Sequence, residues 1–362
     1  MSESQAIDIN SACFDEIMDD IRVASFNVHG WRDTHHKPSL DGVIEVIELL
    51  NPDVLVLNEV LEPFFPSSMT EEYWSAVKAG NGASVNVAEL QKSATGSSAL
   101  HRLAKSLGLT HVCFGAALES GYFGHNVSYG NAILSRLPII SQSVVSFDPP
   151  DRFQASRRIE AERRVCCMVR LRLRGGVHVT VAATHLDQLS EGLRELQVSS
   201  FLDAYSAFEP DVSARLLAGD FNVFHRADHT KASWKVLCDE WESRGWPAPP
   251  EKSAAVEKVL ASWNDAFYHA KYRRSETPTS TCWAIKPLFR IDYIFCDRKS
   301  TAVQRYGCFT DTLVSDHFPI YADFAVCSKP MHEMRDGVPP RPHSPRTVSC
   351  NFSASSNSSA KL

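Results

Sequence analysis

At several places in this chain, an apolar run typical of a buried strand is followed directly by Asp, Asn, Glu or His, whose side chains can bind ions or transfer protons. The clearest case is "ARLLAGDFNVF" (214–224), in which a run of apolar residues is followed by Asp220 and Asn222. Residues i and i+2 of a strand share a face, so these two side chains point the same way. The same spacing recurs in "THLD", where His185 and Asp187 follow an apolar run.

Other strand ends also carry polar groups: Asn27 and His29 in "SFNVHG", Glu59 in "VLNEV", Asp292 in "RIDYIF", and Asp316 with His317 in "SDHFPI". A single Asp or Asn at a strand exit is most simply a turn or capping residue. Six such ends in one chain indicate instead that the strand ends converge on one polar site. Hard oxygen ligands without cysteine favour Mg²⁺ or Mn²⁺ over Zn²⁺ at such a site.

Strand-like and helix-like segments are interleaved along the chain. Strands are expected at 21–28, 53–60, 131–135, 164–173, 178–186, 216–223, 290–296 and 318–326. Helices are expected at 39–50, at 190–208 and within 257–267, where apolar residues recur near helical spacing; Ser39 and Ser190 would cap the first two, and the third would end near Asn264. Because some strands follow one another directly, the pattern predicts an α/β (α+β) fold of two packed sheets with helices on the outside.

The ordered series "FNVHGW", "LNEV", "GNAILSR", "THLD", "GDFNVF", "RIDYIF" and "SDHFPI" resembles the endonuclease/exonuclease/phosphatase superfamily. The resemblance implies a four-layer α/β sandwich of the deoxyribonuclease I-like type, with two largely antiparallel sheets. We expect an acidic N-terminal tail at 1–20, one domain at 21–327, and a disordered Ser/Pro-rich tail at 328–362. Residues 62–98 are expected to form an insertion loop that borders the cleft and contains a helix around 71–78.

The resemblance also implies a role for each polar strand end. Glu59 would be the principal metal ligand, with Asn27 beside it, and Asp316 would complete a second metal position or orient neighbouring residues. Asp220 and Asn222 would position or activate the attacking water and contact the scissile phosphate.

Two imidazoles complete the implied catalytic set. His317 would lie against the phosphate, oriented by Asp292, and His185 would be the second imidazole facing it. Three further residues are expected to bind the phosphate or the substrate: Arg164, Asn131 and Asp187. One departure from the family pattern is Asn58, which stands before the glutamate where the family usually has glutamine.

These residue types suit the hydrolysis of phosphate esters. A divalent ion neutralises a phosphate oxygen, and imidazole moves protons near neutral pH. We therefore expect a Mg²⁺-dependent phosphoesterase, with Mn²⁺ as a substitute, that hydrolyses phosphodiesters in nucleic acids or nucleotide-linked adducts by metal-activated water attack. A lipid or inositol-phosphate phosphoesterase on the same fold is the alternative. A catalytically silent binding module is disfavoured, because every implied catalytic position is filled.

Charge gives no strong attraction toward polyanions. The net charge is −6, and setting aside the acidic first twenty residues and the basic end of the chain leaves about −3 for the body. No secretory signal and no apolar stretch of transmembrane length is visible, and the ten cysteines are scattered without a C-x-x-C pair. We expect reduced thiols in a monomeric protein of the cytoplasm or nucleus.

Overall fold

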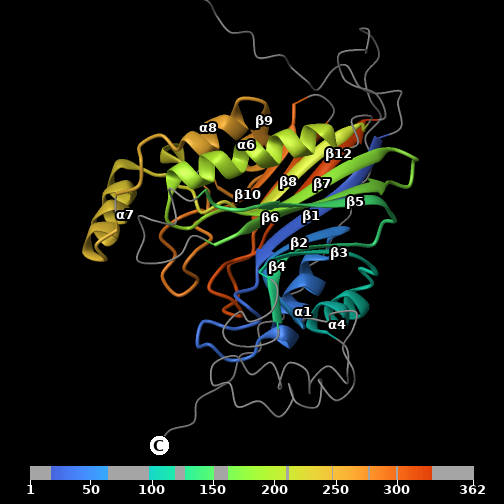
Figure 1. Ribbon diagram of the computed structural model, residues 1–362, viewed down its shortest axis with the longest axis horizontal. Coiled ribbons are helices and arrows are strands. Elements are labelled where there is room, and N and C mark those ends of the chain that lie inside the picture. The colour runs from blue at the N-terminus through green and yellow to red at the C-terminus, as the bar shows by residue number, and fades with distance from the viewer. Residues whose placement is uncertain are drawn as a thin grey trace, which may run out of the picture.

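Two β-sheets pack face to face, and helices cover the outer face of each, which gives four layers (Figure 1). The structure is a computed structural model that describes residues 18–63, 98–118, 127–150, 162–208, 212–246, 248–275, 278–298 and 301–327. Within these residues the predicted architecture is confirmed: two largely antiparallel sheets between layers of helices. None of the described helices is long and apolar enough to cross a membrane.

The first sheet has six strands in the order β11-β12-β1-β2-β4-β3. Its strands are β1 (Met18–Asn27), β2 (Val54–Pro63), β3 (His111–Leu118), β4 (Val127–Ser135), β11 (Thr301–Cys308) and β12 (Ile320–Cys327). Only β1 and β2 among these neighbours run parallel, and they bring Asn27, the last residue of β1, opposite Asn58 of β2.

The second sheet also has six strands, in the order β5-β6-β7-β8-β10-β9. Its strands are β5 (Ile139–Phe147), β6 (Arg164–Arg172), β7 (His178–His185), β8 (Ala214–Asp220), β9 (Trp263–Asp265) and β10 (Asp292–Asp297). The parallel pair is β7 and β8, with His185 opposite Asp220, while antiparallel β10 begins with Asp292 opposite the same residue. Gly219, with φ +141°, pairs with Thr184 just before this end.

The helices are α1 (Leu40–Leu50), α4 (Ala99–Leu107), α6 (Glu191–Ala207), α7 (Lys231–Ser243), α8 (Ala254–Leu260) and α9 (Ala266–His269), with the 3₁₀ turn η3 (Arg226–Asp228). Helices α1 and α4 cover the first sheet and α6 and α8 cover the second, while α7 projects from the side (Figure 1). The hydroxyl of Ser190 accepts the amide of Leu193 at the start of α6, as predicted, whereas Ser39 makes no side-chain capping bond.

Three apolar layers hold the sandwich together. Between the sheets, β-branched residues such as Val56 and Val181 form the central core, where alternating strand positions bury them completely. Separate clusters lie beneath α1 and α4, and beneath α6 and α8. A smaller aromatic cluster that includes Phe224, Trp241 and Phe289 joins α7 to the segment before β10.

One predicted helix is wrong in its extent. The helix predicted in 257–267 is expected to end near Asn264, but α8 ends at Leu260 and Trp263–Asp265 form strand β9. Pairing with β10, which sets Asn264 against Cys296, overrides the local helical pattern. The sequence also left β3, β5, β11, α4 and α7 unassigned. Most of the 62–98 segment and both predicted tails, apart from 18–20, lie outside the described residues.

A buried ion-pair cluster fixes the start of β10. Arg290 is 1% exposed and donates to both carboxylate oxygens of Asp265, at 2.8 and 2.7 Å. Its guanidinium also lies 3.4 Å from Asp228 and 4.3 Å from the centre of the Tyr293 ring. Asp228 belongs to the turn after β8, and Asp265 ends β9. The cluster therefore joins the segment before Asp292 to the ends of both strands that pair with β10.

Replacing Arg290 with methionine should lower the free energy of unfolding by about 3–5 kcal/mol, because two carboxylates would lose their buried partner. Chemical denaturation at neutral pH measures this loss. The matched control is Arg305→Met, since Arg305 is half exposed and lies 3.9 Å from Asp323. The control should cost about 0–1 kcal/mol. Equal losses in both variants would contradict a dominant role for the buried cluster.

Candidate active site

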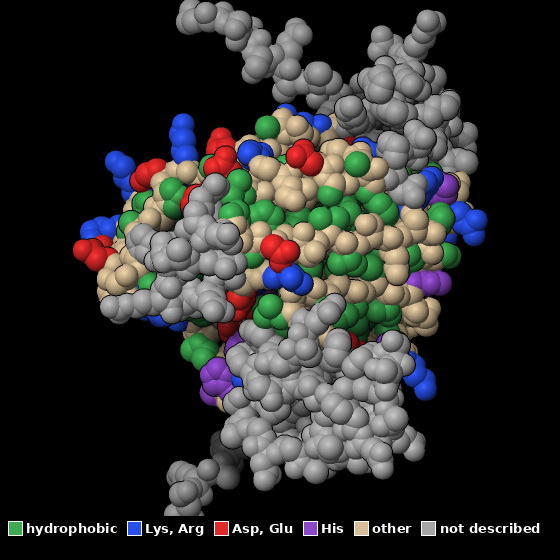
Figure 2. Space-filling view, viewed as in Figure 1, with side chains coloured by type: hydrophobic (Ala, Val, Ile, Leu, Met, Phe, Trp, Pro, Cys, Tyr) green, Lys and Arg blue, Asp and Glu red, His purple; other side chains and the backbone are tan. Residues whose placement is uncertain are grey.

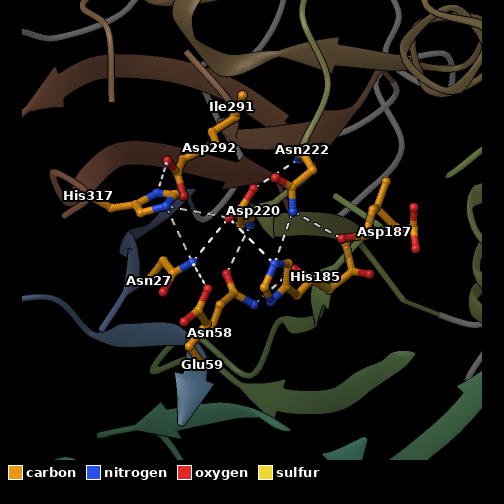
Figure 3. A network of polar contacts seen from close by, with 12 residues as sticks. Asn27, Asn58, Glu59, His185, Asp187, Asp220, Asn222, Ile291, Asp292 and His317 are labelled. Atoms are coloured by element: carbon orange, nitrogen blue, oxygen red, sulfur yellow. Dashed lines mark hydrogen bonds and ion pairs between the residues drawn. The ribbon is translucent and has the colours of Figure 1, made fainter. Parts of the chain in front are cut away.

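Polar side chains from both sheets meet at the end of the sandwich where the parallel strands finish (Figure 3). Asn27 and Glu59 come from the first sheet, and His185 and Asp220 come from the second. All of the strand ends identified in the sequence lie at this end of the molecule: Asn27, Glu59, His185, Asp220, Asn222, Asp292, Asp316 and His317.

Asn58 joins the two sheets beneath the site. Its side-chain nitrogen donates to the Asn131 side chain and to the carbonyl of Thr184, both at 2.9 Å. Its side-chain oxygen accepts the backbone N–H of Asp220, also at 2.9 Å. Asn58 is fully buried and uses every one of these groups, so the departure from the usual glutamine leaves a complete hydrogen-bond set.

Asn27 links the metal-ligand candidate of the first sheet to the second sheet. Its Nδ2 donates to Glu59 and to Asp220, at 3.0 Å in each case, and lies 3.5 Å from Nε2 of His317. Its Oδ1 accepts the backbone N–H of His29 at 3.0 Å. The amide group is therefore held in one orientation by partners on three sides.

His317 and Asp292 form a buried pair. Nδ1 of His317 lies 2.8 Å from the Asp292 carboxylate, and Nε2 lies 3.7 Å from Asp220. Burial lowers the pKa of His317, but the neighbouring Cys282 and Asp292 raise that pKa well above its ordinary value. The backbone amide of Asp292 is in turn fixed by the hydroxyl of Thr281. The pair therefore presents a protonated imidazole toward Asp220.

His185 has the opposite character. Burial and the nearby positive charge of Arg164 hold the pKa of His185 well below its ordinary value, so its ring is neutral. Its Nε2 accepts from the Asn222 side chain at 3.0 Å, and its Nδ1 lies 3.4 Å from the hydroxyl of Tyr129. Asn222 also donates to the carbonyl of Leu186 at 3.0 Å. The site thus contains one charged and one neutral imidazole.

Asp220 lies between the two imidazoles. Its carboxylate is 3.6 Å from His185 and 3.7 Å from His317, and it accepts the backbone N–H of Asn222 at 2.9 Å. Burial and the charge of Asp292 raise the pKa of Asp220 to about 7. Ligand atoms of Asp220, Asp292 and His317 lie within 4.8 Å of one another.

Glu59 and Asp316 suit a divalent cation. Burial raises the pKa of Glu59, and the negative charge of Asp316 raises it further, so the two carboxylates repel each other in the absence of a counter-charge. Such a pair of oxygen donors, with the Asn27 amide beside it, has the chemistry that hard divalent ions prefer. The residues present therefore fit the metal that the sequence motifs imply.

Backbone conformation supports a functional reading of this corner. Glu59 has φ +56°, His29 has φ +47° and Asn222 has φ +50°. Left-handed conformations are uncommon for residues other than glycine, and they concentrate at sites where function dictates the placement of a side chain. Backbone hydrogen bonds fix this part of the chain, including Gly30 N–H to Glu59 O at 3.0 Å.

The three predicted substrate-binding residues occupy different environments. Arg164 is 2% exposed, and its Nε and one terminal nitrogen have no hydrogen-bond partner among the described residues. Asn131 is buried and uses both side-chain groups internally, on Asn58 and on the carbonyl of Val165. The Asp187 carboxylate accepts the backbone amides of Leu189 and Ser190 ahead of α6. Only Arg164 of the three retains unpartnered donors.

The arginines around Arg164 do not form one group. Arg170 and Arg172 pair with the far end of β7, opposite Thr180 and His178, whereas Arg164 is close to His185. Arg157, Arg158 and the aromatic residues of the 62–98 segment lie outside the described residues.

Several residues that position the site were not singled out in the sequence analysis. Thr281, Cys282 and Ser315 contact the loops of the candidate site, and the Ser315 hydroxyl donates to the carbonyl of Asn27 at 2.7 Å while accepting the N–H of His317. Tyr129 approaches His185 from β4. Ser315 precedes the Asp-His pair directly and so had a local signal, whereas Thr281 and Tyr129 are brought in by folding alone.

Comparisons with known proteins agree with this arrangement. A model of the Endonuclease/Exonuclease/phosphatase family matches residues 24–317. Among solved structures, an endonuclease/exonuclease/phosphatase from Beutenbergia cavernae is 22% identical, with a TM-score of 0.58 over 85% of this chain and 72% of that one. A family protein from Bacteroides thetaiotaomicron is 16% identical, with a TM-score of 0.55 over 86% of this chain and 99% of that one.

A mannosyl-6-phosphatase from Bacteroides thetaiotaomicron is also similar in structure. It is 16% identical and has a TM-score of 0.54 over 84% of this chain and 99% of that one. At these identities the similarity shows a shared fold. A comparison with curated proteins finds no match.

Replacing Asn58 with leucine should lower the free energy of unfolding by about 3–5 kcal/mol, because three buried polar groups would lose their partner. Thermal or chemical denaturation measures the loss. Ser25→Ala is the control: Ser25 is fully buried on β1, and its hydroxyl has no partner among the described residues. That change should alter the stability by less than about 1 kcal/mol. A mild effect of Asn58→Leu would argue against Asn58 as the link between the sheets.

Proposed function

The chain belongs to the endonuclease/exonuclease/phosphatase family, and from its site we propose that it is a divalent-metal-dependent phosphoesterase that hydrolyses phosphodiesters in nucleic acids or nucleotide-linked adducts. The observation that carries the proposal is the convergence of Glu59 and Asp316 with two imidazoles, His185 and His317, around the buried Asp220. This set combines oxygen donors for a cation with groups that contact an anionic phosphate and move its protons.

Glu59, Asp316 and Asn27 are the residues that would hold the metal, with Mg²⁺ as the proposed ion. When bound, such an ion neutralises a non-bridging phosphate oxygen and lowers the pKa of a bound water. It would also relieve the repulsion between Glu59 and Asp316, which adds to burial in raising the pKa of Glu59.

The remaining residues have complementary tasks. The protonated His317, held by Asp292, suits the stabilisation of negative charge on the phosphate. The Asp220 carboxylate suits the orientation of the attacking water, since the Asn27 amide and the Asn222 backbone fix its two oxygens. Asn222 can donate to a phosphate oxygen in place of its present contact with His185.

Arg164 favours an anionic substrate next to His185. Its guanidinium is buried, keeps its charge and has two donor nitrogens without a partner in the described part of the chain. A phosphate oxygen is the ligand that such a group binds best. On the face seen in Figure 2, the described Lys and Arg side chains are scattered and several lie beside acidic ones.

Replacing Glu59 with glutamine should lower kcat for bis-p-nitrophenyl phosphate and for short DNA and RNA strands by about 10³-fold or more, because the cation would lose a charged ligand. Rates with Mg²⁺, Mn²⁺ or EDTA measure the effect. Glu48→Gln, an exposed change on α1, is the control and should leave the rates unchanged.

Full activity in Glu59→Gln, or activity that survives EDTA, would contradict the proposed metal site. If the folded wild-type protein hydrolyses none of these substrates with any metal, the nucleic-acid proposal fails. Phospholipid and inositol-phosphate substrates, tested in the same panel, would then distinguish a different phosphoesterase from an inactive protein.

A further inference from the structure

Tyr129 reaches from the first sheet to an imidazole of the second. It lies on β4, opposite Leu61 of β2, and is 6% exposed. Its hydroxyl oxygen lies 3.4 Å from Nδ1 of His185, and the centres of the two rings are 6.5 Å apart. The other ring nitrogen, Nε2, lies 3.0 Å from the Asn222 side chain and 3.6 Å from Asp220 (Figure 3). The imidazole is therefore held between the Tyr129 hydroxyl and the centre of the site.

The side chain of Asn222 determines where His185 carries its proton. Nδ2 of Asn222 lies 3.0 Å from the carbonyl oxygen of Leu186, which only accepts, so the orientation of the amide is fixed and the same nitrogen faces His185. An amide nitrogen donates and does not accept, so Nε2 of His185 is the nitrogen without a proton. A neutral imidazole has a single N–H, which therefore lies on Nδ1 and donates to the Tyr129 hydroxyl.

The binding of a phosphate changes the surroundings of this ring. Burial and the charge of Arg164 hold the pKa of His185 well below its ordinary value, so the ring keeps a single proton. In the proposed function, Asn222 exchanges its contact with His185 for a phosphate oxygen. Nε2 then loses its donor and faces the Asp220 carboxylate, which attracts a proton to that nitrogen. Among the hydrogen bonds of the described residues, the contact with Tyr129 is then the one that still holds the proton on Nδ1.

We propose that Tyr129 is a positioning residue that keeps the proton of His185 on Nδ1, so that Nε2 presents its lone pair toward Asp220 when a phosphoester binds. The inference rests on the proposed function and deepens it. A lone pair at Nε2 accepts a hydrogen bond from the water that Asp220 orients, whereas an N–H at that position does not. Without the hydroxyl, a buried N–H at Nδ1 would lose its acceptor, and this cost would move the proton to Nε2.

The first test locates the proton by NMR of the full chain with ¹⁵N in its histidine rings. The signals that disappear in His185→Gln belong to this ring. Asn222→Gly reproduces the departure of the amide, and glycine adopts the φ of +50° at this position without strain. We expect the proton on Nδ1 in the wild type and in Asn222→Gly. In the double variant Asn222→Gly/Tyr129→Phe we expect the proton on Nε2.

The second test measures the hydrolysis of bis-p-nitrophenyl phosphate with Mg²⁺. Tyr129→Phe should lower kcat about 10-fold or more and change KM less than about twofold, because the variant loses a proton acceptor and keeps the groups that bind the phosphate. Tyr205→Phe is the matched control in both tests: Tyr205 is 1% exposed, and its hydroxyl donates to the carbonyl of Leu216 at 2.9 Å. The control removes a buried hydroxyl that is bonded to the backbone, so kcat and the position of the His185 proton should remain those of the wild type.

The inference is overturned if the wild type carries the proton of His185 on Nε2, if the proton stays on Nδ1 in the double variant, or if Tyr129→Phe keeps the wild-type kcat. These outcomes are separate from the test of the proposed function. Metal-dependent hydrolysis with an unchanged kcat in Tyr129→Phe would leave the phosphoesterase standing and remove the role of Tyr129. A proton that moves in the double variant, in a protein that hydrolyses no phosphoester, would retain the positioning contact and remove the proposed function.

Discussion

The hydrogen bonds of Asn58 are the contact on which the geometry of the site depends. A sandwich of two sheets is held mainly by apolar side chains, which resist separation but define the relative height of the two sheets less sharply. Asn58, on the first sheet, binds the backbone of both β7 and β8 in the second. Hydrogen-bond directionality at the edge of the apolar core therefore helps to place Glu59, the next residue, and Asp220 where both accept from the Asn27 side chain.

Charge is distributed unevenly within this site. One corner holds two carboxylates, Glu59 and Asp316, that destabilise each other. The other side holds a charged imidazole, His317, and a neutral one, His185. Such a division lets a cation and a phosphate bind side by side, each against groups of suitable charge, in a setting where burial strengthens both interactions.

The polar strand ends were predictable because strand geometry is local. The period of two fixes the common face of Asp220 and Asn222, and parallel pairing puts the ends of neighbouring strands together. The contacts of Asn131 and Asp187 could not be predicted from the sequence, since a polar residue at either position could bind a substrate or stabilise the fold. The hydrogen bond of Asn131 joins it to Asn58, which is distant in the sequence. The bonds of Asp187 depend on the turn that forms ahead of α6. Strand β9 was missed for a related reason, because pairing across the sheet decided its conformation.

At Gly219 the close approach of β7 and β8 leaves no room for a side chain. A Cβ atom at this position would lie 1.9 Å from the carbonyl oxygen of Thr184, which is backbone and cannot rotate away. Any side chain here would spread β7 from β8 one residue before His185 and Asp220. The distance between the His185 imidazole and the Asp220 carboxylate therefore depends on the absence of a side chain at position 219. We conclude that the glycine of "LLAGDFN" is as much a part of the reacting geometry as the charged residue that follows it.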